Sequence, residues 1–247
     1  MREGVRDFYT LARTPASGSD KVLRCNFSST ASSTSAGGFC TEKIKFSTAA
    51  VPSLWTDTQY RDAVEPEPDT KDWTWTLQRR CPQCGLAAGE VPLDEVANRA
   101  FVAAEEWVQI LRSSPAVVAR PQPDVWSPLE YGAHVRDVFR LFDQRLMLMQ
   151  SEDDPQFANW DQDETAVQER YGEQDPEVVA DELEAAAGTL VGHISALRSD
   201  QLDRTGRRSD GSEFTVVTLL QYFLHDVVHH LWDVTGQQDA AESLALE

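Results

Sequence analysis

The feature that most constrains this chain is the stretch of residues 219–234, LLQYFLHDVVHHLWDV, in which apolar side chains recur at helical spacing. Positions i, i+3, i+4 and i+7 are apolar in a helix that buries one broad face, so the stretch predicts a helix in the core of an all-α bundle. His225 and His229 stand four residues apart on it, and their imidazoles should project from one side, one turn apart. Three of the five histidines lie in this stretch.

Three further helices are predicted before this one. The first spans about residues 92–112, and the third opens at Asp175 and runs to about residue 197. The second has the clearest start, because Ser127 as N-cap, Pro128 at the first helical position and Glu130 three residues after the cap form a capping box. His134 lies on its apolar stripe. Together with a fourth helix from near residue 215, these predict a four-helix bundle over residues 92–236.

The remaining segments are predicted to be less regular. Residues 1–64 contain a Ser/Thr/Ala/Gly-rich run and are expected to be a disordered or non-native N-terminal extension. Residues 65–91 are expected to form an extended arm, in which the alternation of Trp73, Trp75 and Leu77 favours a short strand or an extended segment. The long polar connection 152–174 suggests a lid or binding loop, residues 204–211 a second loop, and residues 237–247 a flexible tail.

The arm contains Cys81-Pro82-Gln83-Cys84. A Cys-x-x-Cys pair can be half of a zinc knuckle, a redox pair or a structural bend. A complete structural zinc site needs four ligands, and the sequence has no second Cys-x-x-Cys. The role of Cys81 and Cys84 therefore stays open, with metal binding as one alternative.

Charge excludes several partners. With 22 Lys and Arg against 41 Asp and Glu, the net charge of −19 repels nucleic-acid phosphate and anionic membrane surfaces. No apolar run approaches the roughly 18 residues that a membrane-spanning helix needs, and the first 30 residues lack the apolar core of a signal peptide. We expect a cytoplasmic protein without nucleic-acid or membrane partners.

Histidines on two facing helices indicate a metal site. An unpartnered imidazole among aliphatic side chains costs roughly 1–3 kcal/mol, and His134 on the second helix offers a third nitrogen to His225 and His229. Asp137, Asp226 and Asp233 each lie about one turn from a histidine and are candidates for orienting it. The His225-x-x-x-His229 spacing resembles that of zincins, but Asp226 occupies the position where those enzymes need glutamate.

The stretches WSPLEYGAHVRDV at residues 126–138 and HDVVHHLWD at residues 225–233 resemble the DinB/YfiT-like metal-dependent superfamily, which includes mycothiol- and bacillithiol-dependent S-transferases. The likeness extends over about residues 65–234. With CPQCG at residues 81–85 and NWDQD at residues 159–163, the chain is most similar to an actinobacterial branch of that superfamily.

The resemblance implies a divalent ion, zinc or nickel, held by His134, His225 and His229 with an open position for water or a thiolate. It predicts a metal-dependent S-transferase that adds a low-molecular-weight thiol, mycothiol, to a small electrophile. A metal-dependent hydrolase and a non-catalytic, metal-stabilised stress-response or binding module are the alternatives, and a homodimer stays open. Four polar side chains are further candidates for the active site. We expect Arg207 and Arg208 to steer an anionic ligand, and Asn159 and Asp161 to contact it from the lid.

Overall fold

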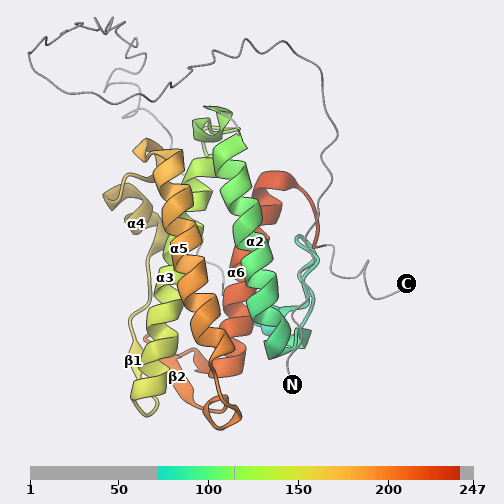
Figure 1. The fold of residues 1–247 in the computed structure, drawn as a ribbon, viewed down its shortest axis with the longest axis vertical. Helices are drawn as coiled ribbons and strands as arrows, with labels where there is room; N and C mark the ends of the chain where they lie inside the picture. Colours follow the sequence, from blue (N-terminus) through green and yellow to red (C-terminus); the bar gives the residue numbers. More distant parts are fainter. Residues whose placement is uncertain (1–71, 114, 240–247) are drawn as a thin grey trace, which may run out of the picture. The chain divides into compact units, whose positions relative to one another are not determined.

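Four long helices form a bundle in the computed structural model of the protein, which describes residues 72–113 and 115–239. They are α2 (Leu93–Ser113), α3 (Pro128–Ser151), α5 (Pro176–Ser195) and α6 (Val216–Thr235), shown in Figure 1. The four-helix bundle expected from the sequence is confirmed. The predicted N-terminal extension, residues 1–64, lies outside the described residues.

Local sequence signals set where these helices begin and end. The Ser127 hydroxyl accepts from the Glu130 amide at 3.2 Å while the Glu130 carboxylate accepts from the Ser127 amide at 2.7 Å, so the predicted capping box is present. Asp175 caps α5 and Thr215 caps α6. Helix α6 stops at Gly236, whose φ of 68° is a left-handed conformation that glycine adopts without strain.

The order of helices around the bundle differs from their order in the chain. Helix α2 packs against α5 and α6, and α3 packs against the same two helices. Consecutive helices α2 and α3 therefore lie diagonally opposite each other, as do α5 and α6. The core between them is filled by large apolar side chains with almost no exposed surface, among them Trp107, Phe139, Leu183, Leu190, Leu219 and Phe223.

The connections are more ordered than the sequence suggested. The connection after α3 contains strand β1 (Gln156–Phe157), helix α4 (Gln162–Gln168) and the 3-10 helix η4 (Tyr171–Glu173). The predicted loop 204–211 is instead part of a hairpin of β2 (Thr205–Arg208) and β3 (Glu213–Thr215), and β1 pairs with β2 in parallel. Short 3-10 helices, η3 (Pro115–Val118) and η5 (Ser199–Gln201), complete the other two connections.

The arm before the bundle packs on α6. It contains the 3-10 helices η1 (Thr74–Leu77) and η2 (Ala88–Glu90), both in contact with α6. The short strand or extended segment predicted at residues 73–77 is a 3-10 turn instead, because the amides of Thr76 and Gln78 donate to the carbonyls of Trp73 and Trp75 at 3.1 and 3.0 Å. The Gln221 side chain of α6 in turn donates to the Val91 carbonyl at 2.9 Å.

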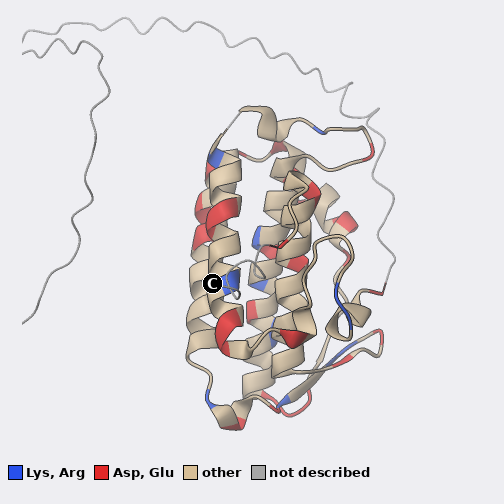
Figure 2. Ribbon diagram, turned by 90° about the vertical axis from the view of Figure 1, so that its right-hand side faces the viewer, with Lys and Arg blue, Asp and Glu red and all other residues tan. Residues whose placement is uncertain are grey.

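The surface reflects the acidic composition. Figure 2 shows Asp and Glu along the helices and in the connections, with fewer Lys and Arg among them.

Residues 237–239, expected to begin a flexible tail, are bound to the arm. The backbone amide of Asp239 donates to the Cys84 carbonyl at 2.7 Å, and the side-chain amide of Gln238 donates to the Gln83 carbonyl at 3.0 Å. Within the described part of the chain, every helix is too short or too polar to cross a membrane.

Candidate metal centre

Helix α6 carries two overlapping pairs of metal-binding residues, His225 with His229 and Asp226 with His230. Successive helical positions are rotated by about 100°, so the two pairs project toward different neighbours. Two groups of potential ligand atoms result, each with its atoms within 4.8 Å of one another. We call them the arm cluster, which consists of Cys81, Cys84, His225 and His229, and the bundle cluster, which consists of His134, Asp226 and His230.

The three histidines predicted to share one ion are thus divided. His134 projects from α3 toward Asp226 and His230, whereas His225 and His229 face the arm. The ligand grouping expected from the sequence, His134 with His225 and His229, is corrected on this point, while the metal-binding role of each imidazole stays a prediction. The repeated spacing of Asp226 and His230 was the signal that could have revealed the second pair.

In the bundle cluster, the carboxylate of Asp226 lies between the two imidazoles. Its Oδ1 is 3.3 Å from His134 Nε2 and 3.7 Å from His230 Nε2. On the other side of its ring, His230 Nδ1 is 2.8 Å from Asp233 Oδ2. A carboxylate on Nδ1 fixes the imidazole tautomer and puts the lone pair that can bind a metal on Nε2, an arrangement common at metal-binding histidines. Asp233, expected to orient His229, contacts His230.

Burial and hydrogen bonding set the protonation states of this cluster. Burial lowers the pKa of His134, which keeps its ring neutral despite the hydrogen bond to Asp226. Burial would raise the pKa of Asp226, but the hydrogen bond from His134 and the nearby imidazoles lower it to about 2. The pair therefore presents a neutral imidazole and a carboxylate at neutral pH, which are the forms that bind a divalent cation.

Aromatic rings enclose His134 and leave its partners accessible. The indole of Trp160, from the connection after α3, stacks on His134 with 5.2 Å between centroids and 9° between planes. Trp126 lies 5.6 Å from the same ring, and Tyr131 lies 5.2 Å from the ring of His230. The side chain of His134 is fully buried, while the side chains of Asp226 and His230 are 23% and 16% exposed to solvent. An ion held here would be reached from the side of Asp226 and His230.

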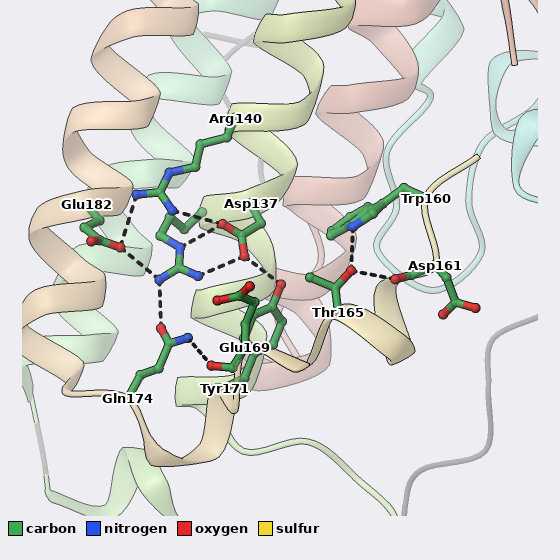
Figure 3. A network of polar contacts seen from close by, with 10 residues as sticks. Asp137, Arg140, Trp160, Asp161, Thr165, Glu169, Tyr171, Gln174 and Glu182 are labelled. Atoms are coloured by element: carbon green, nitrogen blue, oxygen red, sulfur yellow. Dashed lines mark hydrogen bonds and ion pairs between the residues drawn. The ribbon is translucent and has the colours of Figure 1, made fainter. Parts of the chain in front are cut away.

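Trp160 also lines a cleft of about 370 Å³ between α3 and the connection that follows it. Its indole donates to the Thr165 hydroxyl at 2.8 Å, as Figure 3 shows. The network at this site holds the connection against the bundle (Figure 3). The cleft is lined by Arg136, Asp137, Arg140, Leu141, Gln144, Trp160, Thr165 and Glu169.

Arg136 and Asp137 make most of the contacts in that network. The Arg136 guanidinium, 6% exposed, donates to Asp137 at 2.9 and 2.8 Å, to Gln174 at 2.7 Å and to Glu182 at 2.9 Å. Asp137 also accepts from the Tyr171 hydroxyl at 2.7 Å. Burial raises the pKa of the Tyr171 hydroxyl, and the adjacent Asp137 carboxylate raises it further, so this hydroxyl acts as a donor. Asp137, expected to orient His134, instead joins α3 to the connection.

In the arm cluster the donors come from two distant parts of the chain. Cys81 and Cys84 are free thiols in a tight turn closed by a hydrogen bond from the Gly85 amide to the Cys81 carbonyl at 3.0 Å. Cys81 Sγ lies 3.6 Å from His229 Nδ1. Nε2 of His225 is buried without a hydrogen-bond partner. Burial lowers the pKa of His225 to about 4 and raises that of Cys84 to about 12.

The other predicted site residues have structural partners. Arg207 pairs with Asp154 at 2.6 Å and Arg208 with Asp210 at 2.7 Å. The backbone amide of Asn159 donates to the Ser209 hydroxyl at 2.9 Å, and Asp161 caps α4 by accepting from the backbone amide of Glu164 at 2.9 Å. None of Arg207, Arg208, Asn159 and Asp161 belongs to either cluster or lines the cleft as the described residues form it. A catalytic role for them stays a prediction.

The fold and the bundle cluster together define a class of protein. It is a four-helix bundle that carries two histidines and one carboxylate, a set of ligands that suits a divalent ion. A family model described as the DinB superfamily matches residues 103–234, and the chain belongs to that superfamily. The fold is similar to that of YfiT from Bacillus subtilis, described as a probable metal-dependent hydrolase with an unusual four-helix bundle topology. That match has a TM-score of 0.54 and 16% identity and covers 58% of this chain and 84% of the other. No curated protein matches the chain.

Proposed function

We propose that this protein is a metal-dependent enzyme that transfers a low-molecular-weight thiol to a small electrophile, with the divalent ion held by the bundle cluster. The observation that carries the proposal is the convergence of His134, Asp226 and His230 around one point. Trp160, which stacks on His134, also lines a polar cleft. The buried Nδ1 of His134 has no hydrogen-bond partner, and a cation bound between His134 Nε2 and Asp226 would replace the 3.3 Å hydrogen bond that now joins them. Three protein ligands are typical of catalytic sites, which keep a position open for a reactant.

Each residue of the cluster has a distinct task. His134, covered by Trp160 and Trp126, supplies a ligand that is shielded from water and held in a fixed orientation. Asp226 supplies the negative charge that a divalent cation requires. His230, oriented by Asp233, and Asp226 border the more exposed side, so a reactant would approach past these two side chains.

The chemistry follows from the open position. A bound divalent ion lowers the pKa of a coordinated thiol or water and supplies a nucleophile at neutral pH. The cleft offers the guanidinium, amide and hydroxyl groups of Arg140, Gln144 and Thr165. Such groups suit a hydrophilic thiol, and mycothiol is the one that the sequence resemblance favours.

The test combines metal content with thiol consumption. Full-length protein loaded with zinc or nickel is incubated with mycothiol and a chlorinated aromatic electrophile. We expect Asp226→Ala and His134→Ala each to lower bound metal by about one equivalent and to abolish thiol consumption. His193→Ala is the matched control, because His193 lies on α5, pairs with Asp143 and belongs to neither cluster. Unchanged metal content and rate in Asp226→Ala would refute the assignment.

A metal-dependent hydrolase is the second candidate, favoured by the description of YfiT. The same ion would then activate water, and ester or amide substrates would turn over without any thiol. Elemental analysis should cover iron as well as zinc and nickel, because two histidines and one carboxylate also suit iron(II). Metal binding with neither thiol transfer nor hydrolysis would favour a non-catalytic, metal-stabilised module.

A further inference from the structure

We propose that the arm cluster is a second metal site, a closed structural zinc site that fastens the arm to α6. Its four potential ligand atoms, two sulfurs and two ring nitrogens, come from Cys81, Cys84, His225 and His229 and lie within 4.8 Å of one another. This ligand set is separate from the bundle cluster and shares no residue with it.

The separation between Cys81 and His229 suits a tetrahedral ion. Zinc binds sulfur at about 2.3 Å and nitrogen at about 2.0–2.1 Å, which places the ligand atoms of a tetrahedron roughly 3.3–3.8 Å apart. The 3.6 Å separation between Cys81 Sγ and His229 Nδ1 falls in that range. Two sulfurs with two nitrogens in tetrahedral geometry are the set that favours zinc over harder metals.

The local backbone is shaped for this role. The turn Cys81-Pro82-Gln83-Cys84 directs both thiols inward, and Gly85 follows it with φ 82°, a left-handed conformation that other residues rarely adopt. The Cys81 amide bonds the Leu86 carbonyl at 2.9 Å and closes the turn further. The thiols therefore reach α6 from a turn that is already formed.

Burial makes a bound ion more favourable than an empty cluster. Both cysteines are completely buried, and His225 and His229 are 3% and 6% exposed. The unpartnered Nε2 of His225 carries a desolvation cost in the absence of a ligand. Two thiolates would balance the charge of Zn²⁺, so the filled site is neutral and all four of its ligand positions are occupied by protein.

The surroundings indicate a structural rather than a catalytic site. The ring of Trp73 covers the two imidazoles, with centroids 5.6 Å from His225 and 4.8 Å from His229. A site with four protein ligands under an aromatic cover has no open position for a reactant. Because Asp226 and His230 each directly follow one of its histidines, an ion here would also fix the rotation of α6 that points them into the bundle.

Cobalt(II) substitution of the full-length chain tests this site. Tetrahedral cobalt bound by thiolates gives an intense thiolate-to-metal charge-transfer absorption, which we expect in the wild type and in His134→Ala but not in Cys81→Ser/Cys84→Ser. The matched control is Cys25→Ser/Cys40→Ser, which removes the other two cysteines of the chain and should retain the absorption. The same absorption in Cys81→Ser/Cys84→Ser as in the wild type would overturn the proposal. Because His134→Ala is defective only in the bundle cluster, failure of the proposed catalysis would not affect this result.

A second measurement does not depend on the folding of the double-serine variant. In Cys25→Ser/Cys40→Ser, Cys81 and Cys84 are the remaining thiols, and their reaction with a thiol reagent is followed in the native protein. We expect them to be protected after zinc loading and to react after chelation, when the zinc of the arm cluster is released. Equal reaction rates with and without a chelator, or a Cys81–Cys84 disulfide in protein kept under reducing conditions, would contradict the zinc site.

Discussion

Replacing Asp137 with Asn tests how much the network that holds the connection after α3 against the bundle contributes to the free energy of unfolding. The carboxylate accepts four hydrogen bonds, two from Arg136, one from Arg140 and one from Tyr171. Asn preserves the volume but removes the charge and turns a donor toward Arg136. Breaking a buried ion pair costs about 3–5 kcal/mol, but Arg136 keeps Glu182 and Gln174. We therefore expect a loss of about 2–3 kcal/mol in the free energy of unfolding at pH 7.

The same variant predicts a pH dependence. Burial would raise the pKa of Asp137, but the hydrogen bonds from Arg136 and Tyr171 lower it below its usual value. A carboxylate with a lowered native pKa stabilises the fold above its unfolded pKa of about 3.9, and this contribution is lost as the pH falls through the native pKa. The difference in unfolding free energy between wild type and Asp137→Asn should therefore shrink between pH 7 and pH 3.

Urea unfolding of both proteins at a series of pH values measures this difference in unfolding free energy. Because both proteins keep the same metal-binding residues, the contribution of bound metal cancels in the difference. Glu182→Gln is the matched control, because Glu182 bonds the same guanidinium from a side chain that is 41% exposed. Screening by solvent should limit its cost to less than about 1 kcal/mol. The reasoning is refuted if Glu182→Gln is as costly as Asp137→Asn, or if the difference for Asp137→Asn is the same at pH 7 and pH 3.

Three further predictions address other parts of the molecule. Trp160→Ala should raise the pKa of His134 toward its ordinary value in the metal-free protein, because burial is the main cause of its lowering; an unchanged NMR titration would contradict this. Gly206→Ala should cost about 1–3 kcal/mol in urea unfolding, since its Cβ would meet two side-chain carbons at 2.9 Å, whereas Gly188→Ala, with open space on α5, should stabilise by up to about 1 kcal/mol. Zinc binding to the arm cluster should release protons from its thiols, because burial raises the pKa of Cys84 and keeps that thiol protonated until the metal arrives; a pH indicator that records no release would count against thiolate ligands.

The helices were predictable because their signals are local. Ser127 and Glu130 carry a complete capping box within four residues, and the apolar period of residues 219–234 needs no distant partner to be recognised. The 3-10 turn at residues 74–77 was missed because its alternating tryptophans have the period of a strand, while packing on α6 decides the backbone. The strands at residues 205–208 and 213–215 were missed because their sequences, TGRR and EFT, are too short and too polar to show a strand-like alternation.

The site was only partly predictable from the sequence. Helical spacing identified His225 and His229 as a pair, and His134 as a residue on the apolar stripe of another helix. The rotation of α6 within the bundle decides which pair faces α3, and that rotation depends on packing with residues far away in the chain. Cys81 lies 148 residues before His229, so their proximity at 3.6 Å could not follow from either local pattern.

The diagonal placement of consecutive helices has a consequence for how this chain folds. Of the three consecutive pairs of long helices in the described part of the chain, only α3 and α5 share an extensive interface, so a helical hairpin forms early most readily at that position. Helix α2 and helix α6, the first and last of the bundle, must meet across almost its whole length. The chain loses conformational entropy when such a long loop closes, before the buried apolar contacts stabilise it. Folding should therefore be slower than in an up-and-down bundle. During synthesis, the apolar face of α2 stays partly uncovered until α6 has left the ribosome, and the nascent chain is most exposed to aggregation in that interval.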